Sequence, residues 1–274
     1  MDINSWLTVA TRKLAKAEIK SARLDAELIL SHTIRKPRTY LHAHSDEDIE
    51  SGREEVANAR LQMRIEHTPV AYIVGHKEFY RRRFQTTPAT LIPRPESESF
   101  ITLLKDIITK DESLLLTKNN LVDVGTGTGC LGITAKLEWP ELNVILTDES
   151  QHALNLASKN AHLLGADISL LKNNLLRGFT LSADIILANL PYVDPTWDVS
   201  IETKKEPDEA LFARNGGLDL IFQLIEQSSQ ILNAQGHLLL ESDMRQHSDV
   251  ITYAKKHEFN HLKTDGLITY FVKN

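Results

Sequence analysis

The feature that most constrains the fold is a glycine-rich turn that separates an apolar run from an amphipathic segment. Residues 123–129 read Asp-Val-Gly-Thr-Gly-Thr-Gly, and they begin inside the apolar run Leu121–Val124. Glycine permits backbone dihedrals that other residues avoid, and it lacks the Cβ that would block a bound molecule. Turns of this kind join a strand to a helix in α/β sheets and approach the ligand. We therefore expect an α/β fold with a binding site at this turn.

Further apolar runs follow the same pattern along the second part of the chain. Short runs alternate with amphipathic segments beyond about residue 100, as in a parallel sheet covered by helices. The later runs are Val144–Leu146, Ile168–Leu171, Ile185–Ala188 and His237–Leu240, and Ile268, Tyr270 and Val272 alternate as one face of a last strand. Residues 99–274 are therefore assigned to one α/β domain.

The first part of the chain is different and is predicted to be helical. Apolar residues recur at helical spacing near the start, at Trp6, Leu7, Ala10 and Leu14. Further along, Ser45 is placed to cap a helix whose apolar side would hold Ile49, Val56 and Met63. We assign residues 1–67 to a small helical bundle. Residues 68–98, with aromatic and β-branched residues broken by glycine and proline, are predicted to form a hairpin-like connector.

The composition narrows the class of protein. The 274 residues include 42% hydrophobic and 25% charged residues, typical of a globular chain, and the single Cys130 excludes an internal disulfide. There is no signal-like start and no apolar run long enough to span a bilayer, so we expect a cytoplasmic protein with no membrane partner. The net charge of -6 argues against a stable nucleic-acid partner. The histidines form no ligand pattern, so no metal is expected.

Two details of the turn favour S-adenosylmethionine over a dinucleotide cofactor. The glycines occupy three alternate positions and leave Cys130 where a dinucleotide fingerprint has its last glycine. Asp123 would repel a pyrophosphate but could meet the cationic methionine end of the methyl donor. Asp148 ends the next apolar run, where a carboxylate can accept hydrogen bonds from ribose hydroxyls. The expected cofactor residues are Asp123, Gly125, Thr126, Gly127, Thr128, Gly129 and Asp148.

A second motif follows the run Ile185–Ala188. The sequence Asn189-Leu190-Pro191-Tyr192 lies where the carboxyl end of a parallel strand would meet a ligand. It resembles the Asn-Pro-Pro-Tyr motif of methyltransferases that modify planar nitrogens in amides or adenine. The Asn189 side-chain oxygen and the Leu190 carbonyl can both accept hydrogen bonds from an NH2 group, and Tyr192 can pack on a flat substrate. These four residues are the predicted catalytic and substrate-binding loop.

The whole chain resembles the release-factor glutamine N5-methyltransferases, the PrmC/HemK family. The most specific segment is Leu91–Glu96, Leu-Ile-Pro-Arg-Pro-Glu, which the adenine-modifying relatives lack. The other matching segments are Arg23–Leu28, Pro69–Gly75, Glu78–Phe79, Glu206–Pro207, Ala210–Leu211, Gly216–Asp219 and Leu240–Glu241. The resemblance implies a Rossmann-like methyltransferase domain with a seven-stranded sheet, preceded by a helical bundle that grips the release factor.

The resemblance also assigns roles to residues. It implies methylation of the glutamine in the Gly-Gly-Gln motif of release factors, with S-adenosylhomocysteine as the second product. Asn189 would contact both cofactor and substrate, and Arg94 and Glu96 would contact the substrate. Asn174 and Leu175 would lie near the adenine, although the family usually has Asp and an aromatic residue there. Leu190 likewise replaces the usual first proline of the motif but keeps its backbone carbonyl.

Two alternatives stay open. The sequence Asn-Leu-Pro-Tyr also occurs in enzymes that dimethylate adenine of ribosomal RNA, so an adenine N6-methyltransferase of RNA or DNA is the first. The acidic balance and the segment Leu91–Glu96 argue against it. The second is a catalytically weak relative that still binds release factors, for which Leu190, Asn174 and Leu175 are the hints.

Overall fold

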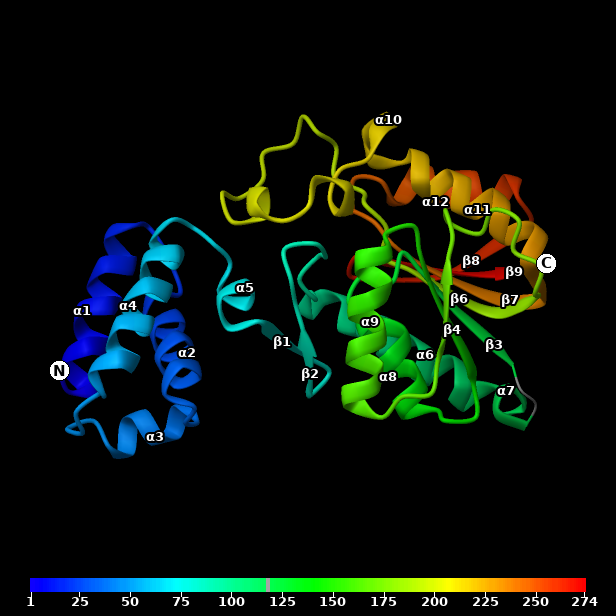
Figure 1. The fold of residues 1–274 in the computed structure, drawn as a ribbon. Helices are drawn as coiled ribbons and strands as arrows, with labels where there is room; N and C mark the ends of the chain where they lie inside the picture. Colours follow the sequence, from blue (N-terminus) through cyan, green and yellow to red (C-terminus); the bar gives the residue numbers. More distant parts are fainter. Residues whose placement is uncertain (117–118) are drawn as a thin grey trace. The chain divides into compact units, whose positions relative to one another are not determined.

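The computed structural model describes residues 1–116 and 119–274 and divides into two compact units (Figure 1). The first unit contains Met1–His76 together with Val199–Lys205, and the second contains Lys77–Asp198 and Glu206–Asn274. The first unit thus takes up residues 68–76, which the sequence placed in the connector, and a short segment from far along the chain.

Five α-helices build the first unit. They are α1 (Ile3–Lys16), α2 (Ala22–Ile34), α3 (Arg38–Ala43), α4 (Ser51–Ile65) and α5 (Val70–Val74). Asp2 caps α1, because its carboxylate accepts a hydrogen bond from the Ser5 amide at 2.8 Å. The apolar spacing predicted for α1 is correct, since Trp6, Leu7 and Leu14 are all buried in the core of the bundle.

The prediction for the later helix was wrong in both its start and its buried face. Helix α4 begins at Ser51 rather than after Ser45, and the side chains of Val56 and Met63 are 46% and 44% exposed. Its buried face instead includes Arg64, whose guanidinium donates to the Asp25 carboxylate at 2.7 Å. A buried charge with a partner on another helix is compatible with a core, but apolar spacing cannot reveal it.

The connector combines a helix and a hairpin. Residues 70–74 form α5, where the sequence predicted no helix. Strands β1 (His76–Phe79) and β2 (Arg82–Gln85) then pair as a two-stranded sheet, as the sequence predicted. Tyr80 and Arg81 form the turn with positive φ values of 46° and 61°, which matches the twist that two-residue hairpin turns require.

The second unit is built on a seven-stranded sheet with the order β5-β4-β3-β6-β7-β9-β8. The strands are β3 (Asn120–Val124), β4 (Asn143–Asp148), β5 (Ser169–Lys172), β6 (Ala183–Ala188), β7 (Leu232–Glu241), β8 (Phe259–Asp265) and β9 (Ile268–Lys273). The first five strands in this order run parallel, whereas β9 pairs antiparallel with both β7 and β8. This is the predicted α/β fold.

Helices cover both faces of this sheet (Figure 1). The longer helices are α6 (Ser99–Lys110), α8 (Cys130–Glu138), α9 (Gln151–Leu164), α11 (Asp219–Ile231) and α12 (His247–Lys256). The second unit also has the short helices η1 (Pro95–Glu98), α7 (Ser113–Leu116), η3 (Asp208–Ala210) and α10 (Arg214–Gly217), whereas η2 (Thr203–Lys205) belongs to the first unit. Neighbouring strand residues point to opposite faces. Leu121 therefore packs with α6, α8 and α9, whereas Val122 and Val124 pack with α11 and α12.

The strand order creates a place for a ligand. Strand β3 pairs with β4 on one side and β6 on the other, so the chain leaves β3 and β6 in opposite directions at their carboxyl ends. Open α/β sheets bind their ligands in the crevice at such a reversal. Within residues 1–116 and 119–274, no helix combines the length and apolar character needed to cross a bilayer.

Candidate active site

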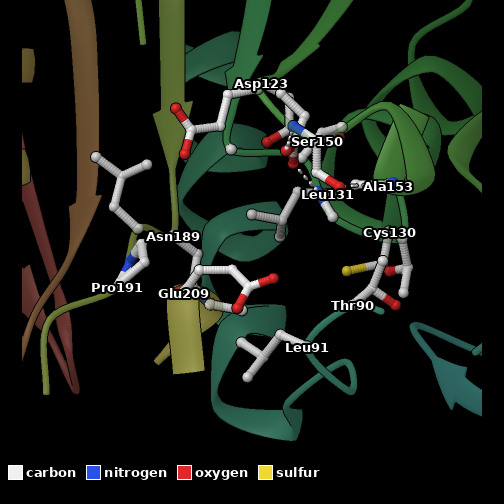
Figure 2. A pocket seen from close by; sticks show the side chains of 18 of the residues that line it. Thr90, Leu91, Asp123, Cys130, Leu131, Ser150, Ala153, Asn189, Pro191 and Glu209 are labelled. Atoms are coloured by element: carbon white, nitrogen blue, oxygen red, sulfur yellow. Dashed lines mark hydrogen bonds between the residues drawn. The ribbon is translucent and has the colours of Figure 1, made fainter. Parts of the chain in front are cut away.

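A cavity of about 450 Å³ lies at the carboxyl ends of β3, β4 and β6. Figure 2 shows Asn189 and Pro191 on one side of it and Cys130 with Thr90 on the other. The loop after β3, the loop after β6 and the segment 89–94 all contribute to its lining. The two motifs that the sequence singled out, residues 123–129 and 189–192, thus both contribute to the lining of the same cavity.

The wall after β3 is built from backbone. Gly125, Gly127 and Gly129 have positive φ values of 70°, 54° and 82°. A Cβ added at Gly127 would meet no atom within 4 Å, because this residue faces the open cavity. The Gly127 amide donates to the Asp148 carboxylate at 2.9 Å. The turn therefore presents main chain to any molecule in the cavity.

Asp123 stabilises this turn through hydrogen bonds. Its Oδ2 atom accepts hydrogen bonds from the Thr126 hydroxyl at 2.6 Å and from the Gly132 amide at 2.9 Å. The residue is 1% exposed, and burial raises the pKa of its carboxyl group to about 6. Asp123 also lines the cavity. Its bracing contacts are a role that the sequence did not indicate.

Asp148 ends β4 beside the same turn. One carboxylate oxygen accepts from the Gly127 amide and the other from the Ser150 amide at 2.8 Å. Burial raises the pKa of this carboxyl group above its ordinary value. Each oxygen retains a second lone pair for a further donor, so Asp148 can both hold the turn and accept from a ligand.

The next part of the lining comes from the loop after β5. Asn174 donates through Nδ2 to the Glu149 carboxylate at 2.8 Å, which leaves its Oδ1 as an acceptor. Leu175 is buried and has a φ of 50°, an uncommon conformation for a residue with a side chain. Both residues line the cavity, together with Thr126 and Thr128 from the glycine-rich turn.

The opposite wall is the loop after β6. Asn189 donates through Nδ2 to the Ser97 hydroxyl at 3.0 Å. Leu190 and Pro191 line the cavity beside it. Tyr192 is not among the lining residues, and its hydroxyl donates to the Glu241 carboxylate at 3.2 Å. The structure therefore brings the first three residues of the loop to the cavity and places the tyrosine behind it.

Arg94 and Glu96 lie on the segment that precedes α6. Arg94 lines the cavity and donates to the Glu206 carboxylate at 2.6 Å, while the other Glu206 oxygen accepts from the Ile92 amide at 3.0 Å. Glu96 is absent from the lining. Glu206 thus anchors one rim of the cavity.

Sequence reasoning missed the residues that support this wall. Ser97 and Glu206 lie inside matching segments or next to them, and Glu241 ends β7, but nothing in their own spacing pairs them with Asn189 or Arg94. Glu241 offered one usable signal, because a carboxylate at the carboxyl end of an apolar strand lies at the ligand-binding edge. In the part of the chain that the structure describes, no three His, Cys, Asp or Glu side chains are grouped so that they could hold a metal ion.

Comparison with known proteins identifies the family. The model of the PrmC N-terminal domain matches residues 5–75, and that of the methyltransferase small domain matches residues 102–206. A release factor glutamine methyltransferase of Deinococcus radiodurans is 34% identical over 248 residues, which cover 89% of this chain and 87% of that protein. The chain belongs to the release factor glutamine methyltransferase family. By fold and by family it is a methyltransferase.

Two further relatives are similar over most of this chain. A release factor glutamine methyltransferase of Aliivibrio fischeri is 29% identical, over 97% of this chain and 93% of that protein. A bifunctional methyltransferase of Rickettsia conorii is 31% identical over 94% of this chain, which spans only 54% of that longer relative.

Two solved structures share the fold at low sequence identity. A methyltransferase of Pyrococcus furiosus has a TM-score of 0.53 at 14% identity, with 82% of this chain and 100% of that chain covered. A T. thermophilus 16S rRNA N2 G1207 methyltransferase, solved with AdoMet and guanosine, has a TM-score of 0.55 at 14% identity, with 73% and 50% covered. These likenesses concern the methyltransferase fold alone.

Proposed function

We propose that the protein transfers a methyl group from S-adenosylmethionine to the side-chain amide nitrogen, N5, of the glutamine in the Gly-Gly-Gln motif of peptide-chain release factors. The observation that carries the proposal is the Asn189 amide, which is held by Ser97 at the cavity wall in a chain of this family. Because Nδ2 is engaged, the Asn189 Oδ1 remains an acceptor. The reaction would take place in the cytoplasm, where release factors act.

The cavity suits S-adenosylmethionine on physical grounds. Gly127 leaves open space where any other residue would place a Cβ, so the turn can approach a cofactor closely. Asp148 has free lone pairs for ribose hydroxyls, and Asn174 offers an acceptor for an amine. Cys130, at the start of α8, occupies the position where a dinucleotide fold would have its last glycine. When bound, S-adenosylmethionine supplies an electrophilic methyl group on a cationic sulfur.

The residues of the loop after β6 would prepare the substrate nitrogen. An amide nitrogen is a poor nucleophile because its lone pair is delocalised over the carbonyl group. Asn189 Oδ1 and the Leu190 carbonyl can each accept a hydrogen from the substrate NH2 group, which orients the nitrogen and stabilises the positive charge that develops on it. As the methyl carbon passes from sulfur to nitrogen, its bond to sulfur breaks and S-adenosylhomocysteine is left. The nitrogen then releases one proton to water and becomes a neutral methylamide. Tyr192 supports the loop through Glu241 from outside the cavity.

The helical unit would recognise the release factor. The family model of the PrmC N-terminal domain covers residues 5–75, almost the whole of the first part of this unit. Arg94 would contact the substrate at the rim, and Glu96, which is not in the lining, would act on it only through neighbouring residues. No metal is assigned a role in this proposal.

A labelling experiment tests the function. The purified protein is incubated with methyl-labelled S-adenosylmethionine and a release factor, with the same factor carrying Glu for Gln in the Gly-Gly-Gln motif, or with total RNA. We expect label in the unaltered factor only, and mass spectrometry should locate it on the glutamine side chain. Label in RNA alone would contradict the proposal and indicate an adenine methyltransferase. Cofactor binding without any transfer would indicate a relative that has lost turnover.

A further inference from the structure

A chain of hydrogen bonds runs behind the loop after β6. The Asn189 Nδ2 donates to the Ser97 hydroxyl at 3.0 Å, and that hydroxyl donates to Glu241 Oε2 at 2.6 Å. The other carboxylate oxygen, Oε1, accepts from the Tyr192 hydroxyl. Ser97 is 2% exposed and Glu241 1% exposed, so water does not compete for these contacts. One buried carboxylate therefore supports both ends of the loop Asn189–Tyr192.

The direction of this chain depends on the charge of Glu241. An ionised carboxylate can only accept hydrogen bonds, so the single proton of the Ser97 hydroxyl must point toward Glu241. The hydroxyl then meets Asn189 with a lone pair, which requires the Asn189 NH2 group to face Ser97. Asn189 Oδ1 therefore points away from Ser97, and in this orientation it can accept a hydrogen bond from a substrate amide.

We infer that Glu241 is a positioning residue that acts through Ser97 to set which end of the Asn189 amide faces the substrate. This inference rests on the proposed function for its catalytic meaning, although the orientation itself is a property of the free protein. A protonated Glu241 can donate to Ser97, whose own proton is then free to turn toward Asn189. The Asn189 oxygen would then accept a hydrogen bond from the Ser97 hydroxyl, and the Asn189 NH2 group would face the cavity and meet the substrate NH2 as a second donor.

The groups around Glu241 put this change within an accessible pH range. The pKa of Glu241 is raised to about 7, because burial and the nearby Glu96 raise it more than the hydrogen bonds from Ser97 and Tyr192 and the charge of Arg94 lower it. The negative charge of Glu241 also contributes to the raised pKa of the Cys130 thiol. Glu241 is thus ionised above about 7 and neutral below it. The acceptor orientation should be lost as the pH falls through this value.

The test follows the Asn189 side-chain amide by NMR in the cofactor-free protein. Asparagine is labelled with ¹⁵N, and the spectrum of Asn189→Ala identifies the Asn189 NH2 signals. In the parent protein these signals should titrate with a midpoint near pH 7, as the pKa of Glu241 requires. The titration should vanish in Glu241→Gln, which cannot ionise, and in Ser97→Ala, which breaks the connection but leaves the carboxylate in place.

Asp184→Asn is the matched control. Asp184 lies at the start of β6, the strand that Asn189 follows, and its carboxylate accepts from the Asn120 amide and from Asn233 Nδ2. Like Glu241→Gln, this change removes one carboxylate charge with little change in shape. It should leave the Asn189 titration unaltered. A midpoint near 7 that persists in both Glu241→Gln and Ser97→Ala, or no titration in the parent, would overturn the inference.

Methyl transfer adds the functional measurement. Single-turnover transfer by the parent should fall about tenfold per pH unit well below the Glu241 pKa. Transfer by Ser97→Ala at pH 8 should be lower by about tenfold, the effect of one lost hydrogen bond to the amide, and should lack this pH dependence. If Asn189 titrates as expected but no glutamine is methylated, the proposed function fails and the positioning stands. If glutamine is methylated but Asn189 does not titrate, only the positioning fails.

Discussion

The two walls of the cavity are built in different ways. The wall after β3 consists of main chain with glycines at the surface, and it is held by Asp148, which accepts from the Gly127 amide, and by Asp123, which accepts from the Thr126 hydroxyl and the Gly132 amide. The wall after β6 consists of side chains, and its Asn189 depends on Ser97 and Glu241 from other parts of the fold. The wall after β3, here the backbone wall, is fixed once the turn has formed. The order of the wall after β6, here the side-chain wall, depends on every partner in its hydrogen-bond network. We expect the first to determine cofactor affinity and the second to determine the rate of transfer.

Removal of the Asn189 side chain should have the largest effect on transfer. Asn189→Ala removes the acceptor proposed to hold the substrate amide, and loss of one such preorganised group lowers turnover by about a hundred- to a thousandfold. Single-turnover rates and calorimetric binding of S-adenosylhomocysteine measure the two properties separately. If this variant instead keeps its transfer rate and binds S-adenosylhomocysteine about a hundred- to a thousandfold more weakly, the roles assigned to the two walls are wrong.

A substitution at Gly217 should disturb the same wall through its backbone. An added Cβ would lie 1.9 Å from the Tyr192 carbonyl oxygen and 2.5 Å from Gln246 Nε2, which itself donates to that carbonyl. Together with a φ of 82°, this predicts that Gly217→Ala lowers the free energy of unfolding by about 3 kcal/mol. Urea denaturation measures the change. A stability within about 0.5 kcal/mol of the parent would mean that the loop moves freely away from Gly217.

Gly127→Ala should have the smallest effect of the three on the protein itself. Its Cβ would meet no protein atom, so the cost is the strain of a φ of 54°, about 1–2 kcal/mol in unfolding free energy. Because the added methyl group points into the cavity, cofactor affinity should fall, while transfer at saturating cofactor changes little. Calorimetry with S-adenosylhomocysteine and saturating single-turnover rates check this. A slow transfer with normal affinity would assign the turn to the substrate instead.

The difference between the walls also explains what could be predicted from the sequence. The backbone wall is local: Asp123 and Asp148 lie at the carboxyl ends of β3 and β4, and the glycines follow β3 directly, so apolar runs and turn residues were enough to locate the wall. The side-chain wall joins residues 92 and 144 positions apart in the chain, as in the Asn189–Ser97 and Ser97–Glu241 contacts. No local pattern encodes such a pairing.

Errors in the helical unit have a similar cause. The buried face of α4 contains Arg64, which is stabilised there by Asp25 on α2, and this long-range ion pair outweighs the apolar spacing of Val56 and Met63. The short helix α5 was also missed, because a five-residue helix has too few turns to produce a periodic pattern.

The helical unit is formed by two separate stretches of the chain, Met1–His76 and Val199–Lys205. Two separate stretches of the gene therefore encode it. Glu202, in the segment Val199–Lys205, accepts from the Arg64 guanidinium, so a fragment that stops at residue 76 leaves Arg64 with one carboxylate fewer. A fragment that starts at residue 77 carries the segment without its partner. Recombination that exchanges recognition units between relatives must therefore move two pieces of coding sequence together, one of them only seven codons long.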